Sequence, residues 1–205
     1  MNGICVGHSA PGVTVKIIKI VDGIISNLPE DIFLPTGEVG EIIVKGPSVT
    51  KEYYFKEEAT RYSKIIDNGV LWHRIGDVGY VDNSNRIWFC GRKDHRVITE
   101  KETLFTIPVE AVFNCHENVF RSALVGTGEK GRQKPVIIIE PEKGSFPTSK
   151  QGEETFKDEL LNLSSTYDHC QMISEVLFHK SFPVDIRHNA KIYREKLALW
   201  AEERV

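Results

Sequence analysis

The stretch that most constrains the fold is residues 72–94, WHRIGDVGYVDNSNRIWFCGRKD. It contains two runs rich in β-branched and aromatic residues, 78–81 and 86–90, separated by Asp-Asn-Ser-Asn. These turn residues hydrogen-bond to nearby backbone and tolerate unusual dihedral angles, so the stretch predicts a β-hairpin. Asp77 precedes the first run and Arg92 follows the second, which places both charges at the same end of the hairpin. They could grip a small ligand, or they could be ordinary surface charges of a solvated hairpin.

The rest of the first half also alternates between strand and turn patterns. Residues 13–20 and 41–45 are rich in β-branched side chains and predict two strands, the second closed by Gly-Pro. Residues 56–66 are charged and predict a short surface helix at most, followed by an Asn68-Gly69 turn. Strands separated by Gly and Pro turns favour a small antiparallel sheet or barrel.

The second half is mixed. Thr106 is expected to cap a helix that has Pro108 in its first turn. Two strands follow at 122–126 and 136–140, and residues 144–152 form a polar loop. An amphipathic helix, a third strand and a last helix from about Ile192 complete the pattern. The apolar residues that indicate these last elements are Phe156, Leu160 and Leu163, then residues 173–178, then Tyr193, Leu197 and Trp200.

The fold class predicted from these patterns is α+β. Residues 1–91 form a small antiparallel, barrel-like β subdomain, and residues 92–205 form a mixed αββαβα domain. The change of pattern falls close to Gly91, where the chain is polar and charged. Domain joints fall in exposed polar segments that can absorb backbone rotation, so residues 91–94 are a candidate hinge.

The composition excludes several function classes. The 205 residues are 40% hydrophobic and 27% charged, with a net charge of −3, which is typical of a soluble globular protein. The absence of a basic excess disfavours nucleic-acid binding. No long apolar run predicts a membrane span, and Met1-Asn2-Gly3 lacks the basic start of a signal peptide. A cytoplasmic location is therefore expected.

The cysteines do not predict a metal site. Four are present, far apart and without a C-x-x-C pair, which favours reduced thiols. The Cys115-His116 and His169-Cys170 pairs could supply zinc ligands. Adjacent residues point in different directions, however, and structural zinc sites usually space paired ligands by two to four residues. The four cysteines are Cys5, Cys90, Cys115 and Cys170.

Four segments, in this order, resemble motifs of the adenylate-forming superfamily, which includes acyl-CoA synthetases, luciferases and peptide-synthetase adenylation domains. GEVGEIIVKG at 37–46, followed by YYFKEEAT at 53–60, is similar to the G-E-x-G-E-I-x-V-x-G stretch and its sequel. WHRIGD at 72–77 resembles W-x-x-T-G-D, and GRKD at 91–94 matches the G-R-x-D that opens the family's mobile C-terminal domain. AKIYR at 190–194 resembles the terminal G-K-I-x-R. Their compatible spacing across nearly the whole chain makes the set specific.

The resemblance implies a C-terminal portion of an ATP-dependent ligase that adenylates a carboxylic acid. Asp77 would accept hydrogen bonds from the ribose hydroxyls of ATP, and Arg92 would contact the same ribose. Asp94 would be the pivot of domain rotation. Lys191 would bridge the substrate carboxylate and the α-phosphate, where an ammonium can neutralise developing negative charge. ATP and Mg²⁺ are the implied cofactors of the full-length enzyme. Lys191 could instead be an ordinary exposed lysine at a helix start.

The departures from the family motifs point to one branch of it. Residues 99–105 contain no glycine where the family usually has a glycine turn that helps admit the pantetheine arm of CoA. The final run at 183–191 is two residues longer than usual, and Ile75 replaces Thr. These features resemble the olefin-pathway β-lactone synthetases, which adenylate a 3-hydroxy acid and let its own hydroxyl close a lactone. A fatty-acid–CoA ligase stays open, and with it the use of CoA.

The family's phosphate loop and its Y-G-x-T-E motif are missing from the sequence. Residues 126–131, GTGEKG, lie between two predicted strands and indicate a β-turn rather than a phosphate cradle. We therefore expect a fragment that is inactive alone, whose site for ATP and a small carboxylic or 3-hydroxy acid is completed by a missing N-terminal domain. The alternative is a non-catalytic interaction or regulatory module that kept the fold.

Overall fold

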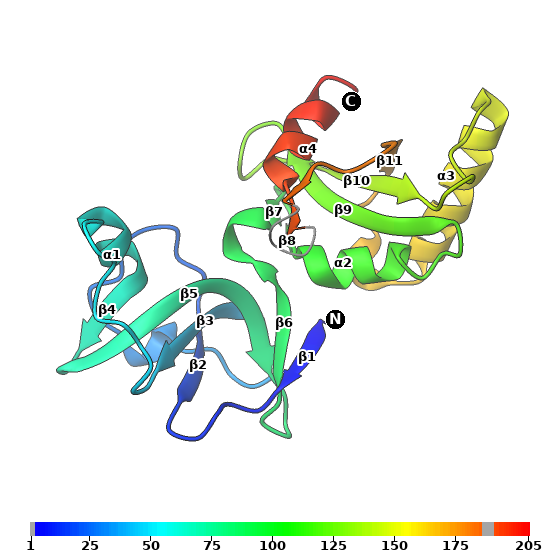
Figure 1. The fold of residues 1–205 in the computed structure, drawn as a ribbon. Helices are drawn as coiled ribbons and strands as arrows, with labels where there is room; N and C mark the ends of the chain where they lie inside the picture. The colour runs from blue at the N-terminus through cyan, green and yellow to red at the C-terminus, as the bar shows by residue number, and fades with distance from the viewer. Residues whose placement is uncertain (1–2, 186–190) are drawn as a thin grey trace. The chain divides into compact units, whose positions relative to one another are not determined.

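The computed structural model describes residues 3–185 and 191–205 (Figure 1). The chain divides into two compact units, Asn2–Asp94 and His95–Val205, called here the β-rich unit and the mixed unit. Two sequence expectations fall partly outside the described residues. They are the absence of a signal peptide, judged from Met1 onwards, and the lengthened final motif, which includes residues 186–190.

The β-rich unit is built on one antiparallel sheet of six strands among the described residues. The strand order is β1-β6-β5-β3-β2, with β4 paired to the far end of β5. The sheet curls along the long strand β5, so the predicted barrel-like antiparallel architecture is confirmed (Figure 1). The strands are β1 (Ile4–Gly7), β2 (Thr14–Ile18), β3 (Gly40–Lys45), β4 (Lys64–Asp67), β5 (Val70–Val81) and β6 (Ile87–Arg92).

The predicted hairpin is formed by β5 and β6. Its turn is stabilised by Asp82, whose carboxylate accepts hydrogen bonds from the backbone N–H groups of Ser84 and Arg86, both at 2.9 Å. The same carboxylate accepts from the Arg86 guanidinium at 2.7 Å and from the Trp88 indole at 2.9 Å. β5 begins at Val70, eight residues before the predicted start, because the Asn68-Gly69 turn pairs β4 with β5 as a second hairpin.

The start of the chain contains a strand that comes before the first one predicted from the sequence, at residues 13–20. This strand, β1, pairs with β6 as an edge strand. The core of the unit lies on one face of the sheet, and α1 (Glu57–Ser63) contributes no buried residue to it. The 3₁₀ turn Glu30–Ile32 closes part of that face. The core residues are Ile18, Ile25, Leu28, Ile32, Ile43, Ile65 and Trp72.

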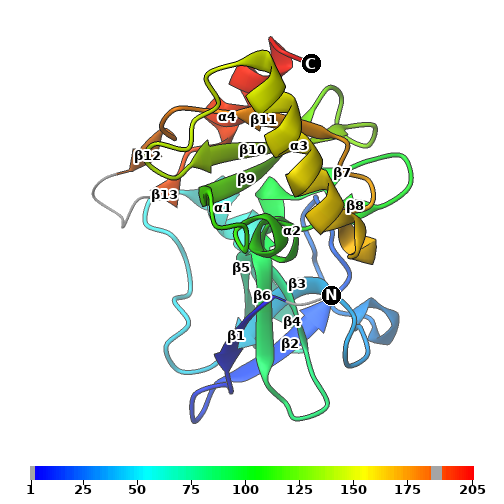
Figure 2. The same cartoon turned by 90° about the vertical axis from the view of Figure 1, so that its right-hand side faces the viewer.

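The mixed unit has a three-stranded sheet covered on both faces. β10 (Lys134–Pro141) lies between β9 (Val119–Thr127), which is antiparallel to it, and β11 (Glu175–Phe178), which is parallel. Helices α2 (Thr106–Phe113) and α3 (Lys150–Ser165) pack with one set of alternating side chains of the sheet, and α4 (Arg194–Glu202) packs with the other (Figures 1 and 2). The predicted αββαβα order is confirmed, with short β7 (Val97–Ile98), β8 (Thr103–Leu104), β12 (Val184–Asp185), β13 (Lys191–Ile192) and 3₁₀ turns Lys93–His95 and Asp168–Cys170 added.

Three local predictions in the mixed unit are wrong. Thr106 is the first residue of α2 rather than its cap, and the capping position is Phe105, which offers no side-chain hydrogen bond. The loop predicted at 144–152 is shorter, because Ser149 caps α3 by accepting from the Gly152 N–H at 3.1 Å. α4 begins at Arg194 rather than Ile192, because Lys191 and Ile192 pair with β12 instead.

No helix within the described residues is long and apolar enough to cross a membrane.

Candidate functional site

Asp77 and Arg92 meet at one end of the β5–β6 hairpin, as their positions in the sequence predicted. They are cross-strand partners in the sheet, and Nη1 of Arg92 lies 3.0 Å from Oδ1 of Asp77. The Arg92 side chain is 53% exposed and that of Asp77 is 22% exposed. The pair therefore lies at the surface, with the carboxylate recessed behind the guanidinium.

The glycines beside these two charges have backbone conformations that other residues rarely adopt. Gly76 has φ +76° and Gly91 has φ +127°. Only glycine accepts such angles without strain, so each motif carries a glycine next to its charged residue for a conformational reason. These two backbone conformations shape β5 and β6 directly beside Asp77 and Arg92.

The carboxylate of Asp77 has hydrogen-bonding capacity left over. Oδ1 is shielded from solvent, yet no donor in the described part of the chain gives it a well-aligned hydrogen bond. Nη1 of Arg92 is close to Oδ1 but donates to the Ile75 carbonyl at 3.2 Å. Burial raises the pKa of Asp77, and the charge of Arg92 opposes that shift. Since unsatisfied buried acceptors are rare, Oδ1 is suited to a hydroxyl donor that displaces the exposed guanidinium.

A buried ionic cluster lies under this end of the hairpin. Glu41 of β3 is fully buried and accepts from Arg74 of β5 through both oxygens, at 3.0 and 2.7 Å. The Arg74 guanidinium also donates to the carbonyls of Gly23 and Tyr62, at 2.6 and 3.1 Å, and to that of Val21. Nζ of Lys93 lies 3.3 Å from Oε1 of Glu41. Neither Glu41 nor Lys93 was predicted as a functional residue. The charge of Glu41 within GEIIVK at 40–45 is visible in the sequence, but it is equally compatible with a solvent-facing position, and Lys93 gives no comparable signal.

Asp94, the predicted pivot, is exposed and is the last residue of the β-rich unit. Lys191 belongs to the mixed unit and is described there by itself. It is exposed at the start of β13, where Asp185 is its cross-strand partner. The Tyr193 N–H donates to the Pro183 carbonyl at 2.9 Å, which fixes the chain between Lys191 and α4.

A second buried ion pair holds the segment that follows Lys191. Nη2 of Arg194 donates to both carboxylate oxygens of Glu110, at 2.9 and 2.7 Å. Glu110 lies in α2 and also accepts from the Leu124 N–H at 2.9 Å. Burial raises the pKa of Glu110, while Arg194 and this N–H oppose the shift. The pair ties the first turn of α4 to the core, three residues after Lys191.

His95, the first residue of the mixed unit after the predicted pivot Asp94, also contacts α4. Its Nε2 lies 3.3 Å from Oε1 of Glu195. Burial lowers the pKa of His95, and the positive charges of Arg194 and Lys191 act in the same direction, although Glu195 opposes them. The neutral imidazole is therefore favoured in the folded mixed unit.

This shift predicts how the stability of the mixed unit depends on pH. Unfolded His95 has a pKa of about 6.5 and binds a proton more readily than folded His95, so stability falls as pH drops through that value. The change His95→Gln should reduce the loss of stability between about pH 7.5 and about pH 5.5. Some loss remains, because burial also lowers the pKa of His179. The stability of the mixed unit at each pH is measured by urea unfolding, monitored through the NMR signals of β10.

The matched control is His8→Gln, which changes an exposed histidine of the β-rich unit. It should leave the pH dependence of the mixed unit unchanged. An equal pH dependence in wild type and His95→Gln would show that His95 titrates alike in the folded and unfolded states.

The turn without glycine at residues 99–105 is stabilised by Thr99. Its hydroxyl accepts from the backbone N–H groups of Lys101 and Glu102, at 3.1 and 3.0 Å, and donates to the Glu102 carbonyl at 2.9 Å. This is an ST-turn, in which the threonine hydroxyl stabilises the turn through hydrogen bonds to nearby backbone groups. The turn therefore forms without a glycine. The exposed side chains of Glu100, Lys101 and Glu102 cover its outer surface.

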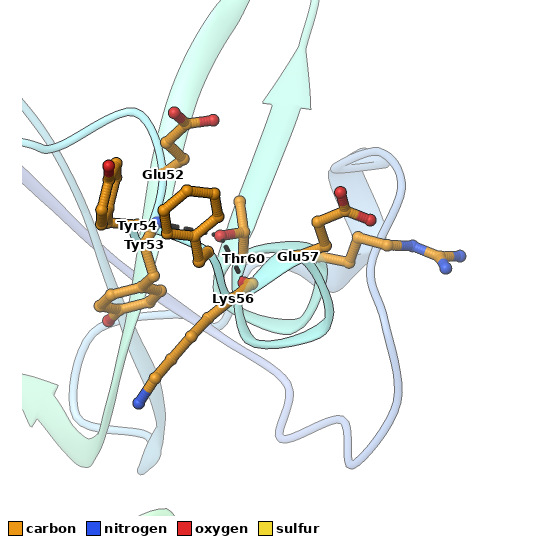
Figure 3. A pocket seen from close by; sticks show the side chains of 8 residues that line it. Glu52, Tyr53, Tyr54, Lys56, Glu57 and Thr60 are labelled. Atoms are coloured by element: carbon orange, nitrogen blue, oxygen red, sulfur yellow. Dashed lines mark hydrogen bonds between the residues drawn. The ribbon is translucent and has the colours of Figure 1, made fainter.

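The hollow shown in Figure 3 lies elsewhere in the β-rich unit. It is lined by residues 52–57 with Thr60 and Arg61, and the rings of Tyr54 and Phe55 are largely exposed beside it. Phe55 has φ +51°, which is uncommon outside glycine. None of the predicted site residues lines this hollow. Among the described residues, no group of three or more His, Cys, Asp or Glu side chains could hold a metal ion.

No family model matches the chain. An olefin β-lactone synthetase of Xanthomonas campestris is 44% identical over 206 residues, which cover 98% of this chain and 36% of that protein. A 2-succinylbenzoate–CoA ligase of Bacillus cereus is 34% identical over 111 residues, covering 54% of this chain and 22% of that protein. The crystal structure of ATP-bound MatB from Rhodopseudomonas palustris matches 97% of this chain and 36% of its own, with 21% identity and a TM-score of 0.76.

The fold and the motif residues define the C-terminal portion of an adenylate-forming enzyme, and the chain belongs to that superfamily. Within it, the chain is similar over nearly its whole length to the olefin β-lactone synthetase, as the departures from the common motifs predicted. The chain covers about a third of the length of the relatives that align with nearly all of its residues.

Proposed function

We propose that the chain is the C-terminal part of an ATP-dependent ligase that adenylates a carboxylic acid, in which Asp77 and Arg92 hold the ribose of ATP. The observation that carries this proposal is the unsatisfied Oδ1 of Asp77 beside an exposed Arg92, both in the family's motif positions. A ribose offers two vicinal hydroxyls. One carboxylate can accept from both, and the planar guanidinium can donate to their oxygens.

Lys191 supplies the positive charge for the adenylation step. In that step a carboxylate oxygen attacks the α-phosphorus and pyrophosphate leaves, so negative charge gathers on the oxygens around phosphorus. An exposed ammonium on a segment held by the Arg194–Glu110 pair can be brought to those oxygens. Asp94 is the pivot that brings it there, and the division between the two units directly after Asp94 supports this role.

ATP enters as the substrate, together with Mg²⁺. The ion would neutralise phosphate charge, and its usual partners are a few carboxylates together with the phosphates themselves. No residue of this chain is proposed as its ligand, because the described residues contain no suitable cluster. The phosphate contacts and the acyl pocket belong to the N-terminal part that the longer relatives possess. The free thiols of all four cysteines fit the predicted cytoplasmic location.

For the product, we propose a β-lactone formed from a 3-hydroxy acid. The 3-hydroxyl oxygen attacks the acyl-adenylate carbonyl, AMP leaves, and the hydroxyl proton is released. Two observations support this proposal: the activity for which the Xanthomonas relative is named, and the Thr99 turn in place of a glycine that would help admit CoA. The 2-succinylbenzoate–CoA ligase relative supports a thioester product instead, so a fatty-acid–CoA ligase is the second candidate.

Joining the chain to the N-terminal remainder of the Xanthomonas relative tests the proposal. We expect the joined protein to catalyse carboxylate-dependent exchange of pyrophosphate into ATP, and the chain alone to show none, because it lacks the phosphate contacts. Pyrophosphate exchange by the chain alone would refute the proposal that its active site is incomplete. If the joined protein folds and binds ATP but gives no exchange, the non-catalytic interaction or regulatory module becomes the better explanation.

The same joined protein separates the two products. With a 3-hydroxy acid, ATP and no CoA, we expect release of a β-lactone, detected by mass spectrometry. A strict requirement for CoA would establish the thioester ligase. The 3-deoxy acid of equal length is the matched control, because it can be adenylated but has no hydroxyl to close the ring.

A further inference from the structure

The hinge sequence GRKD contains one residue to which the family resemblance gives no role, Lys93. Its neighbours Arg92 and Asp94 are exposed, whereas the Lys93 side chain is only 14% exposed. β6 ends at Arg92 and the 3₁₀ turn Lys93–His95 follows, so the Lys93 side chain lies inward directly after the exposed Arg92. The inward side chain needs an explanation, because lysine is almost never buried unless its charge is paired.

The ammonium of Lys93 is held inside the β-rich unit. Nζ lies 3.3 Å from Oε1 and 3.5 Å from Oε2 of Glu41, and donates to the Val21 carbonyl at 3.3 Å. Glu41 has no exposed surface. The contact is therefore screened much less by water and salt than a surface ion pair would be.

We propose that Lys93 is a positioning residue that anchors the fixed side of the hinge. Held on Glu41, it keeps the end of β6 attached to the β-rich unit and confines rotation of the mixed unit to the backbone bonds that follow it. Arg92 then keeps its place beside Asp77 while the mixed unit turns. The anchoring stands on the contacts above, whereas its consequence for ribose binding rests on the proposed function.

The same carboxylate connects both halves of the proposed ribose site. Arg74, which binds Glu41 through two hydrogen bonds, lies three residues before Asp77 on β5. Lys93 directly follows Arg92. Glu41 thus lies between two cationic side chains, one on β5, which carries Asp77, and one directly after β6, which ends at Arg92. Because Arg74 keeps Glu41 neutralised, Lys93 can be changed without leaving the buried carboxylate unpaired.

The experiment measures the freedom of the hinge in the 205-residue chain without nucleotide. Spin labels at Asn83→Cys and Glu154→Cys, both exposed and one in each unit, report the distribution of distances between the units by pulsed EPR. The exposed Cys5 and Cys115 are first changed to Ser. We expect Lys93→Met and Lys93→Gln to broaden the distribution of distances. Lys93→Arg, which keeps the positive charge, should retain the width of the wild type.

The control is Lys19→Met, which breaks an exposed ion pair with Asp31 in the same unit and should leave the width unchanged. Equal widths for wild type, Lys93→Met and Lys93→Gln would overturn the anchor. Because no ATP is present, a failure of the proposed function, seen as absent exchange in the joined protein, would not alter this result. In the joined protein, Lys93→Met is further expected to raise the KM for ATP more than it lowers kcat.

Discussion

The change Arg74→Met should lower the free energy of unfolding of the β-rich unit by about 3 to 5 kcal/mol, the cost of breaking a buried ion pair by removing one partner. Arg74 is 4% exposed and its partner Glu41 is fully buried. Methionine fills much of the space of the arginine stem but carries no charge and donates no hydrogen bond. Glu41 would keep only the more distant Lys93 ammonium.

The loss of stability in Arg74→Met comes from more than the broken ion pair. The Arg74 guanidinium also satisfies the carbonyls of Val21 and Gly23, in the loop after β2, and that of Tyr62, in α1. Buried acceptors that lose their donor keep the full cost of desolvation. A double change, Glu41→Leu with Arg74→Met, should therefore recover only part of the stability. It removes the unpaired carboxylate, but the carbonyls of Gly23 and Tyr62 still lose the Arg74 donor, and that of Val21 keeps only the Lys93 ammonium.

Urea unfolding in a Trp200→Phe background measures this loss, because the remaining tryptophans, Trp72 and Trp88, both lie in the β-rich unit. Lys19→Met is the matched control. It breaks an ion pair whose side chains are 54% and 81% exposed, and such pairs contribute only about 0 to 1 kcal/mol. A similarly small effect of Arg74→Met would mean that Glu41 is not held by this arginine in solution.

The hairpin of the β-rich unit could be predicted from the sequence because its information is local. Asp82 and its neighbours make the turn, and the turn sets the register, so the positions of Asp77 and Arg92 in the sequence suffice to place both at one end. The Asn68-Gly69 turn is predictable for the same reason. The length of β5 is not, since its partner β4 lies within a segment whose pattern is that of a charged surface helix.

The buried ionic clusters could not be predicted in the same way. Glu41 and Glu110 lie in apolar runs, where a single charge is compatible with one solvent-facing position of a strand or helix. Their burial depends on partners 33 and 84 residues away, Arg74 and Arg194. Both arginines lie within the family motifs, but the motifs alone give no reason for them. The structure supplies one, since each arginine neutralises a carboxylate beneath a segment that carries a predicted site residue.

Replacing Lys191 by Ala in the joined protein is expected to lower the rate of adenylation by about 100- to 1,000-fold, the cost of removing one preorganised donor at a charged transition state. Lys191 is exposed at the start of β13, so the change should not affect the stability of the mixed unit. The effect should fall on kcat with little change in the KM for ATP, because the ammonium acts on charge that develops only in the transition state.

The control is Lys196→Ala, which removes another exposed lysine from the first turn of α4 and loses only a contact with the Tyr193 ring. It should keep the wild-type rate. The second half-reaction, the breakdown of a supplied acyl-adenylate, gives another comparison. Lys191→Ala should carry out this step at the wild-type rate, because no carboxylate attacks the α-phosphorus in it. Pyrophosphate exchange at the wild-type rate in Lys191→Ala would remove this lysine from the mechanism. Loss of both half-reactions would instead assign it a structural role, because only a lysine that acts on the α-phosphate separates the two.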